Sequence, residues 1–300
     1  MQNKDKLYKI INITGWKEHN EGEYPRPVVI DEQGNKHLVK RDKQQSRINE
    51  MIVTKACEKA GFDAVQNEFA HAEQDDISII SRALDYQIEP LGRYLDFPYN
   101  TPIVNAMNVN LEEMFEQHTI LNDKLKSRFV DEVLLRSLFE DTDSYLAYNI
   151  SVKKLKNATR VITDTSLPPL ELSTSYDFNH CLQRDPKYGY SHKEKVTKNL
   201  KYIRNHYPQN AEKFFASFSF DNATLDELFD LSGAPEEWAS KLGDIREALV
   251  SDTTMISKDT RTIFTENLAF LKDTFAKHGK KTTLYKKRLT CPSKIIYNTQ

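Results

Sequence analysis

The chain has 300 residues, of which 39% are hydrophobic and 29% are charged. That length allows two domains, and the hydrophobic fraction is enough for a substantial core. Because 42 Lys and Arg residues nearly balance 44 Asp and Glu residues, the formal net charge is only -2, and the chain as a whole has no attraction for nucleic acid or for an anionic membrane.

The N-terminus, Met1 to Lys6, is polar and leads into an alternating segment instead of an apolar signal core. No stretch of the sequence approaches the ~18 apolar residues that a membrane helix needs. The three cysteines, Cys57, Cys181 and Cys291, are far apart and show no CxxC spacing, which argues against a disulfide framework and a thiolate metal site. We therefore expect a cytoplasmic protein without a membrane segment.

The first part of the chain has the pattern of a small mixed sheet with one helix. Clustered or alternating apolar residues, flanked by turn formers, predict strands over residues 7–14, 24–31, 36–41, 63–71 and 76–84. Between the third and fourth strands, residues 46–60 change to helical spacing, with Ser46 as a candidate N-cap and Gly61 just after the end.

A linker-like segment, residues 85–110, separates this part from a mostly helical one. Apolar residues at three- and four-residue steps predict helices over 111–120 and 125–139, and helical spacing resumes at Ser191 with a break near Pro208. Residues 140–182 lack this periodicity and are polar, which is typical of loops that carry catalytic groups. The basic segment from Lys277 to Lys294 is expected to be poorly packed.

Lys40 is the first candidate functional residue, because it ends a short predicted strand and Glu50 follows early on the next helix. A partly buried Lys–Glu pair can hold an ammonium group against ATP phosphates. The alternative is a solvated lysine and an exposed glutamate favoured by the helix dipole.

Gly15 and Gly22 bracket a polar segment that we predict to be a single loop between the first two strands. Glycine lets backbone N–H groups approach a phosphate closely, so this loop is a candidate phosphate-binding element. It has no GxGxxG pattern, and a plain strand connection is the alternative.

The segment from Asp141 to Asn149 combines acidic and amide side chains in a predicted loop. A carboxylate here, Asp143, could accept a proton from an acceptor hydroxyl, and Asn149 could turn back towards a metal ion. Asp177 follows a short, partly apolar run and is itself followed by Phe178. Asn149 and Asp177 are hard oxygen ligands of the kind that Mg²⁺ prefers together with phosphate oxygens.

In this order the residues resemble the HipA-type bacterial serine/threonine kinases, in particular the shorter CtkA-like branch, across residues 10–270. The segments that match best are Leu38–Lys40 followed by the Glu50 helix, and Tyr176–Leu182. The resemblance implies an α+β, two-lobed kinase fold with an N-lobe over residues 1–90 and a helical C-lobe over 91–300, holding ATP and Mg²⁺ between them.

By position, the resemblance implies that Lys40 binds ATP and pairs with Glu50, that Asp143 is the base, and that Asn149 and Asp177 hold the magnesium. It also implies a protein substrate with a serine or threonine acceptor. One departure from the family pattern, Asp-x-His-x-x-Asn, is that Tyr145 stands in place of the histidine. Asn149 also lies one residue later than the pattern requires, so Asp141 is an alternative base.

Two other functions stay open. A catalytically inactive pseudokinase could bind a nucleotide or a partner, for instance within a toxin–antitoxin or phage-defence system. A nucleic-acid binder could use the basic C-terminal segment, although a solvated tail is the simpler interpretation, and binding of that kind would depend on salt.

Overall fold

The computed structural model describes residues 7–8, 10–19, 27–40, 44–71, 77–95, 109–118, 121–141, 149–154, 170–178, 181–182, 189–230 and 253–288. Among these residues, no helix combines the length and the apolar character needed to cross a bilayer.

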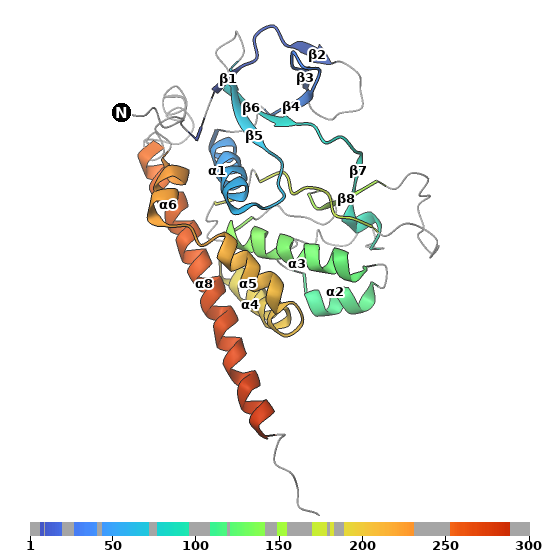
Figure 1. The fold of residues 1–300 in the computed structure, drawn as a ribbon, viewed down its shortest axis with the longest axis vertical. Coiled ribbons are helices and arrows are strands. Elements are labelled where there is room, and N and C mark those ends of the chain that lie inside the picture. The colour runs from blue at the N-terminus through green and yellow to red at the C-terminus, as the bar shows by residue number, and fades with distance from the viewer. Residues whose placement is uncertain are drawn as a thin grey trace, which may run out of the picture.

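A six-stranded mixed sheet forms the N-terminal part of the molecule (Figure 1). β1 pairs in parallel with β5, and every other neighbouring pair in this sheet is antiparallel. The strands in spatial order are β1 (Ile10–Asn12), β5 (Asn67–His71), β6 (Ile77–Arg82), β4 (Lys36–Lys40), β3 (Val28–Ile30) and β2 (Lys17–His19). Each of the five predicted strands overlaps one of these elements.

The segment between Gly15 and Gly22 differs from the predicted single loop. Its residues Lys17–His19 form β2, which pairs with β3 so that Lys17 lies opposite Ile30. The loop prediction rested on the polarity of these residues, but hydrogen bonding to a neighbouring strand does not require apolar side chains at a sheet edge. Gly22 lies outside the described residues.

A second, two-stranded sheet joins two segments that were expected to be irregular. β7 (Ile88–Pro90) lies in the predicted linker and β8 (Ser151–Lys153) in the predicted loop region, and they pair in antiparallel fashion. A short 3-10 helix, η1 (Leu91–Arg93), follows β7. The predictions for 85–110 and 140–182 are therefore wrong over these residues, because these two strands have too few apolar residues to show a clustered or alternating pattern.

The predicted helices are present, with ends shifted by a few residues. Side chains cap several of them: Asn122 accepts from the backbone N–H of Leu125 and Asp221 from that of Thr224. Pro208 sits in the first turn of α5, where its missing N–H has no cost. The helices are α1 (Gln44–Ala60), α2 (Leu111–Gln117), α3 (Asp123–Leu138), α4 (Gly189–His206), α5 (Pro208–Ser217), α6 (Asn222–Phe229) and α8 (Thr253–Arg288). The segment expected to be a poorly packed tail from Lys277 thus begins inside α8.

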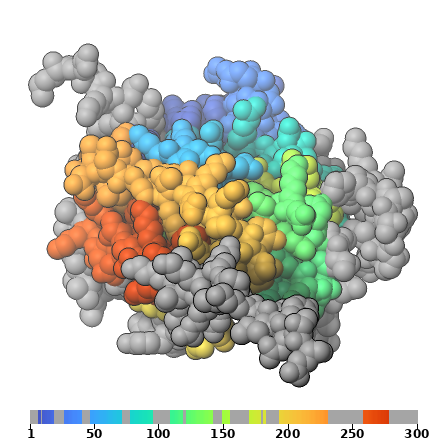
Figure 2. Space-filling view, turned by 60° about the horizontal axis from the view of Figure 1, so that its bottom comes forward, coloured from blue at the N-terminus to red at the C-terminus, as the bar shows by residue number. Residues whose placement is uncertain are grey.

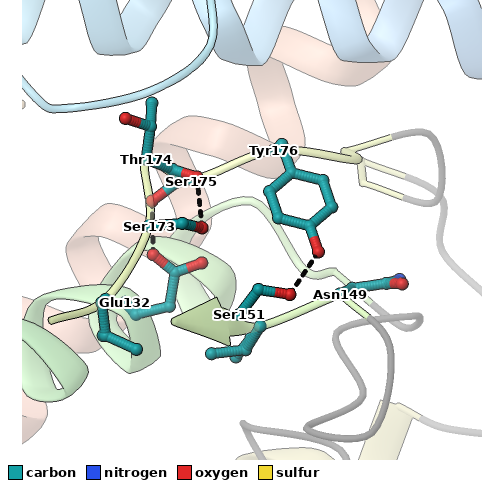
Figure 3. Close-up of a pocket in the computed structure, with 9 residues that line it drawn as sticks. Glu132, Asn149, Ser151, Ser173, Thr174, Ser175 and Tyr176 are labelled. Atoms are coloured by element: carbon teal, nitrogen blue, oxygen red, sulfur yellow. Dashed lines mark hydrogen bonds between the residues drawn. The ribbon is translucent and has the colours of Figure 1, made fainter. Parts of the chain in front are cut away.

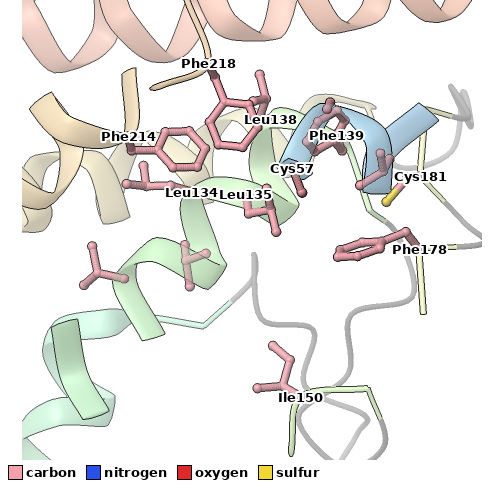
Figure 4. Packing of buried hydrophobic residues seen from close by; sticks show 14 of the residues in the cluster. Cys57, Leu134, Leu135, Leu138, Phe139, Ile150, Phe178, Cys181, Phe214 and Phe218 are labelled. Carbon is pink, nitrogen blue, oxygen red and sulfur yellow. The ribbon is translucent and has the colours of Figure 1, made fainter. Parts of the chain in front are cut away.

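One hydrophobic cluster runs from α1 into the helical part of the molecule (Figure 4). It includes Cys57 of α1, Leu135 of α3, Phe218 beyond α5, and Phe178, all of them buried. In Figure 2 the gold residues of α5 and α6 lie between the light-blue N-terminal residues and the red residues of α8. Because α1 packs on both the sheet and the helices, it links the two parts.

A smaller cluster covers the opposite face of the sheet and consists of Ile13, Val29, Val39, Ala70 and Ile80. Successive side chains of a strand point to opposite faces. With Val39 in this cluster, the next residue of β4, Lys40, points to the face that α1 covers. The sheet therefore directs Lys40 towards the helix that carries Glu50.

Candidate functional site

Lys40 and Glu50 form a buried ion pair. The ammonium of Lys40, at the end of β4, contacts Oε1 of Glu50 on α1, and the two residues are only 7% and 2% exposed. A buried ammonium and carboxylate offset much of each other's desolvation cost only when they are in contact. The alternative of a solvated lysine and an exposed glutamate is therefore wrong.

Two side chains of the sheet support Glu50: Asn67 contacts it directly, and Ser81 contacts Asn67. Asn67 Nδ2 donates to Glu50 Oε1 at 3.1 Å, and Ser81 Oγ donates to Asn67 Oδ1. Asn67 and Ser81 lie directly opposite each other on β5 and β6. The remaining oxygen, Glu50 Oε2, is buried and accepts no hydrogen bond from the described part of the chain, so it can accept one from a bound water or ligand.

Asp177 approaches the same ammonium from a distant part of the sequence. Its Oδ1 lies 3.5 Å from Lys40 Nζ, and its side chain is 19% exposed. Asp177 has a φ of 60°, in the left-handed region that few residues other than glycine adopt. Lys40 thus lies between two carboxylates, one from α1 and one from the segment before Phe178.

Helix α1 is also tied to the segment that follows Asp177. Asn49, next to Glu50, donates from Nδ2 to the backbone oxygen of Cys181 at 2.8 Å and is fully buried. At the far end of α1, Lys59 pairs with Glu227 of α6 at 2.8 Å. The first contact links the helix that carries Glu50 to the segment that carries Asp177, and the second links it to α6.

Asn149 lies beside the Asp177 segment and is 8% exposed. Ser151, two residues later, shares a 2.6 Å hydrogen bond with the hydroxyl of Tyr176, the residue before Asp177 (Figure 3). Burial raises the pKa of Tyr176 above its usual value, so the phenol stays neutral. The hydroxyl pair connects the two segments from which magnesium ligands were predicted.

A small pocket lies behind these two segments, between β8 and residues 172–176 (Figure 3). Its empty volume is about 170 Å³ and includes open solvent at its mouth, so the enclosed space is smaller still. It is therefore too small to hold a nucleotide. Its lining residues are Glu132, Asn149, Ile150, Ser151, Leu172, Ser173, Thr174, Ser175 and Tyr176.

Asp141, the alternative base, is fully buried and faces away from solvent. Its Oδ2 accepts from the guanidinium of Arg136, and its backbone N–H donates to the carbonyl of Arg136 at 2.9 Å. A base must reach the hydroxyl that it deprotonates. Asp141 is therefore a structural partner of Arg136. Asp143 lies outside the described residues.

Arg136 is the residue that the sequence interpretation missed. It is fully buried, and its Nε donates to Glu132 Oε1 at 2.8 Å. Burial opposes its charge, but Glu132 and Asp141 more than offset this and raise the pKa of Arg136 above its usual value. A four-residue spacing of Glu132 and Arg136 on one helix face was a signal in the sequence, although such pairs are usually on the surface.

Gly15 lies in the turn between β1 and β2 with a φ of 82°. Its neighbour Trp16 packs against His37, with the ring centroids 5.0 Å apart. His37 lies in β4, three residues before Lys40. At ~3.3 Å per residue, this contact is roughly 10 Å along the strand from Lys40. A Cβ on Gly15 would meet nothing within 4 Å, so its backbone conformation, not a close contact, explains the glycine.

Lys40, Glu50, Asp177 and Asn149 together provide the chemical groups that can bind a nucleotide with its Mg²⁺. Asp177 and Asn149 offer hard oxygen atoms, and Lys40 offers a cation held in place by Glu50. Mg²⁺ in phosphoryl-transfer sites is usually bound by one or two carboxylates together with substrate phosphates. Among the described residues, no cluster of three or more His, Cys, Asp or Glu residues could hold a metal ion by itself.

Comparison with solved structures identifies the fold. The crystal structure of the Helicobacter pylori proinflammatory kinase CtkA is similar at a TM-score of 0.58 and 9% sequence identity, with 91% of this chain and 100% of CtkA covered. HipA, from a complex of the Shewanella oneidensis HipA–HipB toxin–antitoxin system with its operator DNA, gives a TM-score of 0.43 and 13% identity, with 80% of this chain and 60% of HipA covered. No family model and no curated protein sequence matches the chain.

The fold assignment rests on the similarity to CtkA. At 9% identity, that similarity shows the fold and leaves the activity to be argued from the site. The predicted fold class is confirmed: the chain has a kinase-like fold, with a curled mixed sheet in the N-lobe and a helical second part.

Proposed function

We propose that this protein transfers the γ-phosphate of ATP to a protein hydroxyl. The observation that carries the proposal is the meeting of Lys40, Glu50 and Asp177, which come from β4, α1 and the segment before Phe178. Phosphoryl transfer requires positioning and charge stabilisation more than covalent chemistry, and a lysine fixed by a carboxylate beside a metal-binding aspartate supplies both.

In this proposal each residue has one task. Lys40 contacts the α- and β-phosphates, and Glu50 holds its ammonium in place. Asp177 and Asn149 hold Mg²⁺, which neutralises charge on the phosphates when it is bound. Asp143 accepts the proton of the serine or threonine hydroxyl. The nucleotide lies between an N-lobe of residues 1–90 and a C-lobe of residues 91–300.

The arrangement around Lys40 also predicts that ATP enters with its metal. The ammonium faces two carboxylates in the described part of the chain, Glu50 and Asp177. Metal-free ATP would add negative charge next to them, whereas Mg²⁺ between Asp177 and the phosphates removes that repulsion. We therefore expect ATP to stabilise the protein much more with magnesium than with EDTA.

A nucleotide-binding pseudokinase is the second candidate, and a specific departure favours it. Tyr145 replaces the histidine of the family pattern, and Asn149 follows Asp143 by six residues instead of five. If the protein binds ATP and magnesium without transfer, this candidate is the correct one. A toxin–antitoxin or phage-defence partner is a further prediction, and co-purification would test it.

The test is transfer of radiolabelled γ-phosphate to the protein itself and to a generic protein substrate. Asp177→Asn should lower the rate by about 10³-fold, because an amide of the same shape cannot neutralise the metal charge. Asp259→Asn, at an exposed position of α8, is the matched control and should retain the wild-type rate. Equal rates in wild type and Asp177→Asn would contradict the assignment.

A further inference from the structure

We propose that Arg136 is a positioning residue that fixes the backbone of Asp177 so that its carboxylate faces Lys40 and the metal. This inference rests on the proposed function, which assigns Asp177 to the metal. Arg136 itself touches neither nucleotide nor metal in this proposal. It acts on the segment through the backbone of residues 176 and 177.

The backbone of Asp177 needs such support. With a φ of 60°, it is one of three non-glycine residues in the described part of the chain that have positive φ; the others are Glu140 and Leu182. A left-handed conformation costs a non-glycine residue on the order of 1–3 kcal/mol and persists only where the surroundings impose it. Contacts around Asp177 must therefore favour this conformation.

Arg136 makes contacts of this kind to two successive carbonyls. Its Nη2 donates to the backbone oxygen of Tyr176 at 2.8 Å, and its Nη1 donates to that of Asp177 at 3.2 Å. In an extended strand, successive carbonyls point in opposite directions, whereas helical conformations of either hand turn them to the same side. One guanidinium can bind both carbonyls because Asp177 departs from the extended conformation.

The guanidinium also fixes the residue after Asp177. Its central carbon lies 4.5 Å from the centroid of the Phe178 ring, which is fully buried. A cation over an aromatic face is attracted by the ring's charge distribution. Arg136 therefore contacts three successive residues, 176 to 178, with Asp177 in the middle.

Two acidic residues hold the guanidinium in place. Glu132 accepts from its Nε and Asp141 from its Nη1, and both carboxylates are buried. The planar guanidinium has five N–H donors in a fixed geometry, and the four hydrogen bonds described for Arg136 use several of them at once. Lysine has a single ammonium, so it could keep the charge balance but could not reach both carboxylates and both carbonyls.

The backbone contacts to Arg136 and the side-chain contact to Lys40 meet at Asp177. While Arg136 binds its backbone oxygen, the Asp177 carboxylate lies 3.5 Å from the Lys40 ammonium. Without the two carbonyl contacts, the segment is free to return to an extended conformation. The carboxylate would then turn away from Lys40, and the metal would lose one ligand in its correct position.

The test compares two arginine-to-lysine variants on the same helix. Arg136→Lys keeps the positive charge but loses the fixed donor geometry. Arg128→Lys is the matched control, because Arg128 also donates to a carbonyl, that of Asp63, at 3.0 Å and also lies over a ring, that of Phe62, at 4.6 Å. Its contact to the later segment goes to the side chain of Ser175 and not to residues 176–178.

The readout is the magnesium concentration that gives half of the thermal stabilisation by a non-hydrolysable ATP analogue. We expect Arg136→Lys to raise this concentration by about 10–100-fold, the range typical for residues that support metal ligands. Stabilisation by the analogue in EDTA should be unchanged, and Arg128→Lys should behave like wild type. A folded Arg136→Lys protein with the wild-type magnesium dependence would overturn the inference.

A second variant tests the inference if Arg136→Lys does not fold. The triple variant Arg136→Met, Glu132→Gln and Asp141→Asn removes the buried charges together, which is often tolerated where removal of one is not. It should show the same increase in the magnesium requirement, and a wild-type requirement would overturn the inference. If the wild-type protein shows no magnesium-dependent stabilisation at all, the proposed function fails first, and the inference with it.

Discussion

Two groups of charges contact the Asp177 segment, one through its backbone and one through the Asp177 carboxylate, and they differ in their balance of positive and negative charge. Around Arg136, the two acidic residues Glu132 and Asp141 face a guanidinium, and Arg128 adds a second cation 3.7 Å from Glu132. Around Lys40, a single ammonium faces the carboxylates of Glu50 and Asp177. The first group is neutral, and the second carries one excess negative charge in the described part of the chain.

This difference in charge balance indicates that the Arg136 group stabilises the fold and that the Lys40 group can bind a cationic ligand. Burying charge is costly unless partners in the protein compensate it. In the Arg136 group, Arg136, Glu132 and Asp141 are buried, and the two arginines compensate the two carboxylates, so this group needs no cation from a ligand. The Lys40 group is partly exposed at Asp177 and, in the described part of the chain, sets two carboxylates against one ammonium, so a divalent cation would improve its charge balance. The predictions below test this contrast.

The largest expected effect is on folding, in the Arg136 group. Arg136→Met removes the buried cation that contacts both Glu132 and Asp141 and leaves only Arg128 near Glu132, so it should lower the free energy of unfolding by about 3–5 kcal/mol. Urea denaturation followed by circular dichroism measures this. Adding Glu132→Gln and Asp141→Asn should recover most of the loss, and a triple variant as unstable as the single one would contradict the charge argument.

Lys40→Met should affect stability less and function more than Arg136→Met does. Glu50 keeps its hydrogen bond from Asn67, and Asp177 is partly exposed, so we expect a smaller stability loss of about 1–3 kcal/mol. Phosphate transfer and magnesium-dependent nucleotide stabilisation should be lost in the folded variant. Exposed Lys198→Met on α4 is the control. If Lys40→Met costs as much stability as Arg136→Met, the contrast between the groups is wrong.

The pH dependence of stability should differ between the adjacent acids Asp131 and Glu132. Burial opposes the ionisation of Glu132, but Arg136 and Arg128 more than offset it, so its folded pKa lies below 4.5. Its contribution is therefore present above pH 4.5 and is lost as the pH falls. Burial instead raises the pKa of Asp131, so its ionised form opposes folding above pH 3.8.

Two amide variants check this in urea denaturation between pH 3 and pH 7. Glu132→Gln should destabilise the protein at pH 7, by about 3 kcal/mol, and approach wild type in acid. Asp131→Asn should stabilise it slightly at pH 7, because asparagine can still accept the 3.0 Å hydrogen bond from Asn210. If both variants changed the free energy of unfolding at pH 7 in the same direction, the environments of Asp131 and Glu132 would not have opposite effects on ionisation.

The smallest expected effect is at the hydroxyl pair that joins β8 to the Asp177 segment. Tyr176→Phe removes the hydrogen bond to Ser151 and should cost about 1 kcal/mol of stability, with little change in the magnesium requirement. Ser151→Ala should cost a similar amount or more, because it leaves the buried phenol without this partner. A double-mutant cycle measures the coupling, and a value near zero would show that the pair contributes nothing.

Local patterns in the sequence were enough for the larger elements. The helical spacing of apolar residues predicted α1 and α3 to within two residues at each end, since burying one helix face imposes that spacing. The same reasoning missed β2, β7 and β8, which have three residues each. β1 and β3 are equally short but were predicted because their apolar residues cluster, whereas β2, β7 and β8 have few or no apolar residues and are defined by their pairing with other strands.

The candidate site likewise has features that the sequence predicted and features that only the tertiary structure shows. The sequence alone determined the types and order of Lys40, Glu50 and Asp177, because the chemistry of phosphate and metal binding limits which side chains are suitable. Only the tertiary structure decided that Asp141 is an enclosed partner of Arg136, and that Arg136 contacts residues 176–178. Burial and non-local hydrogen bonds set those roles, and neither leaves a periodic pattern along the chain.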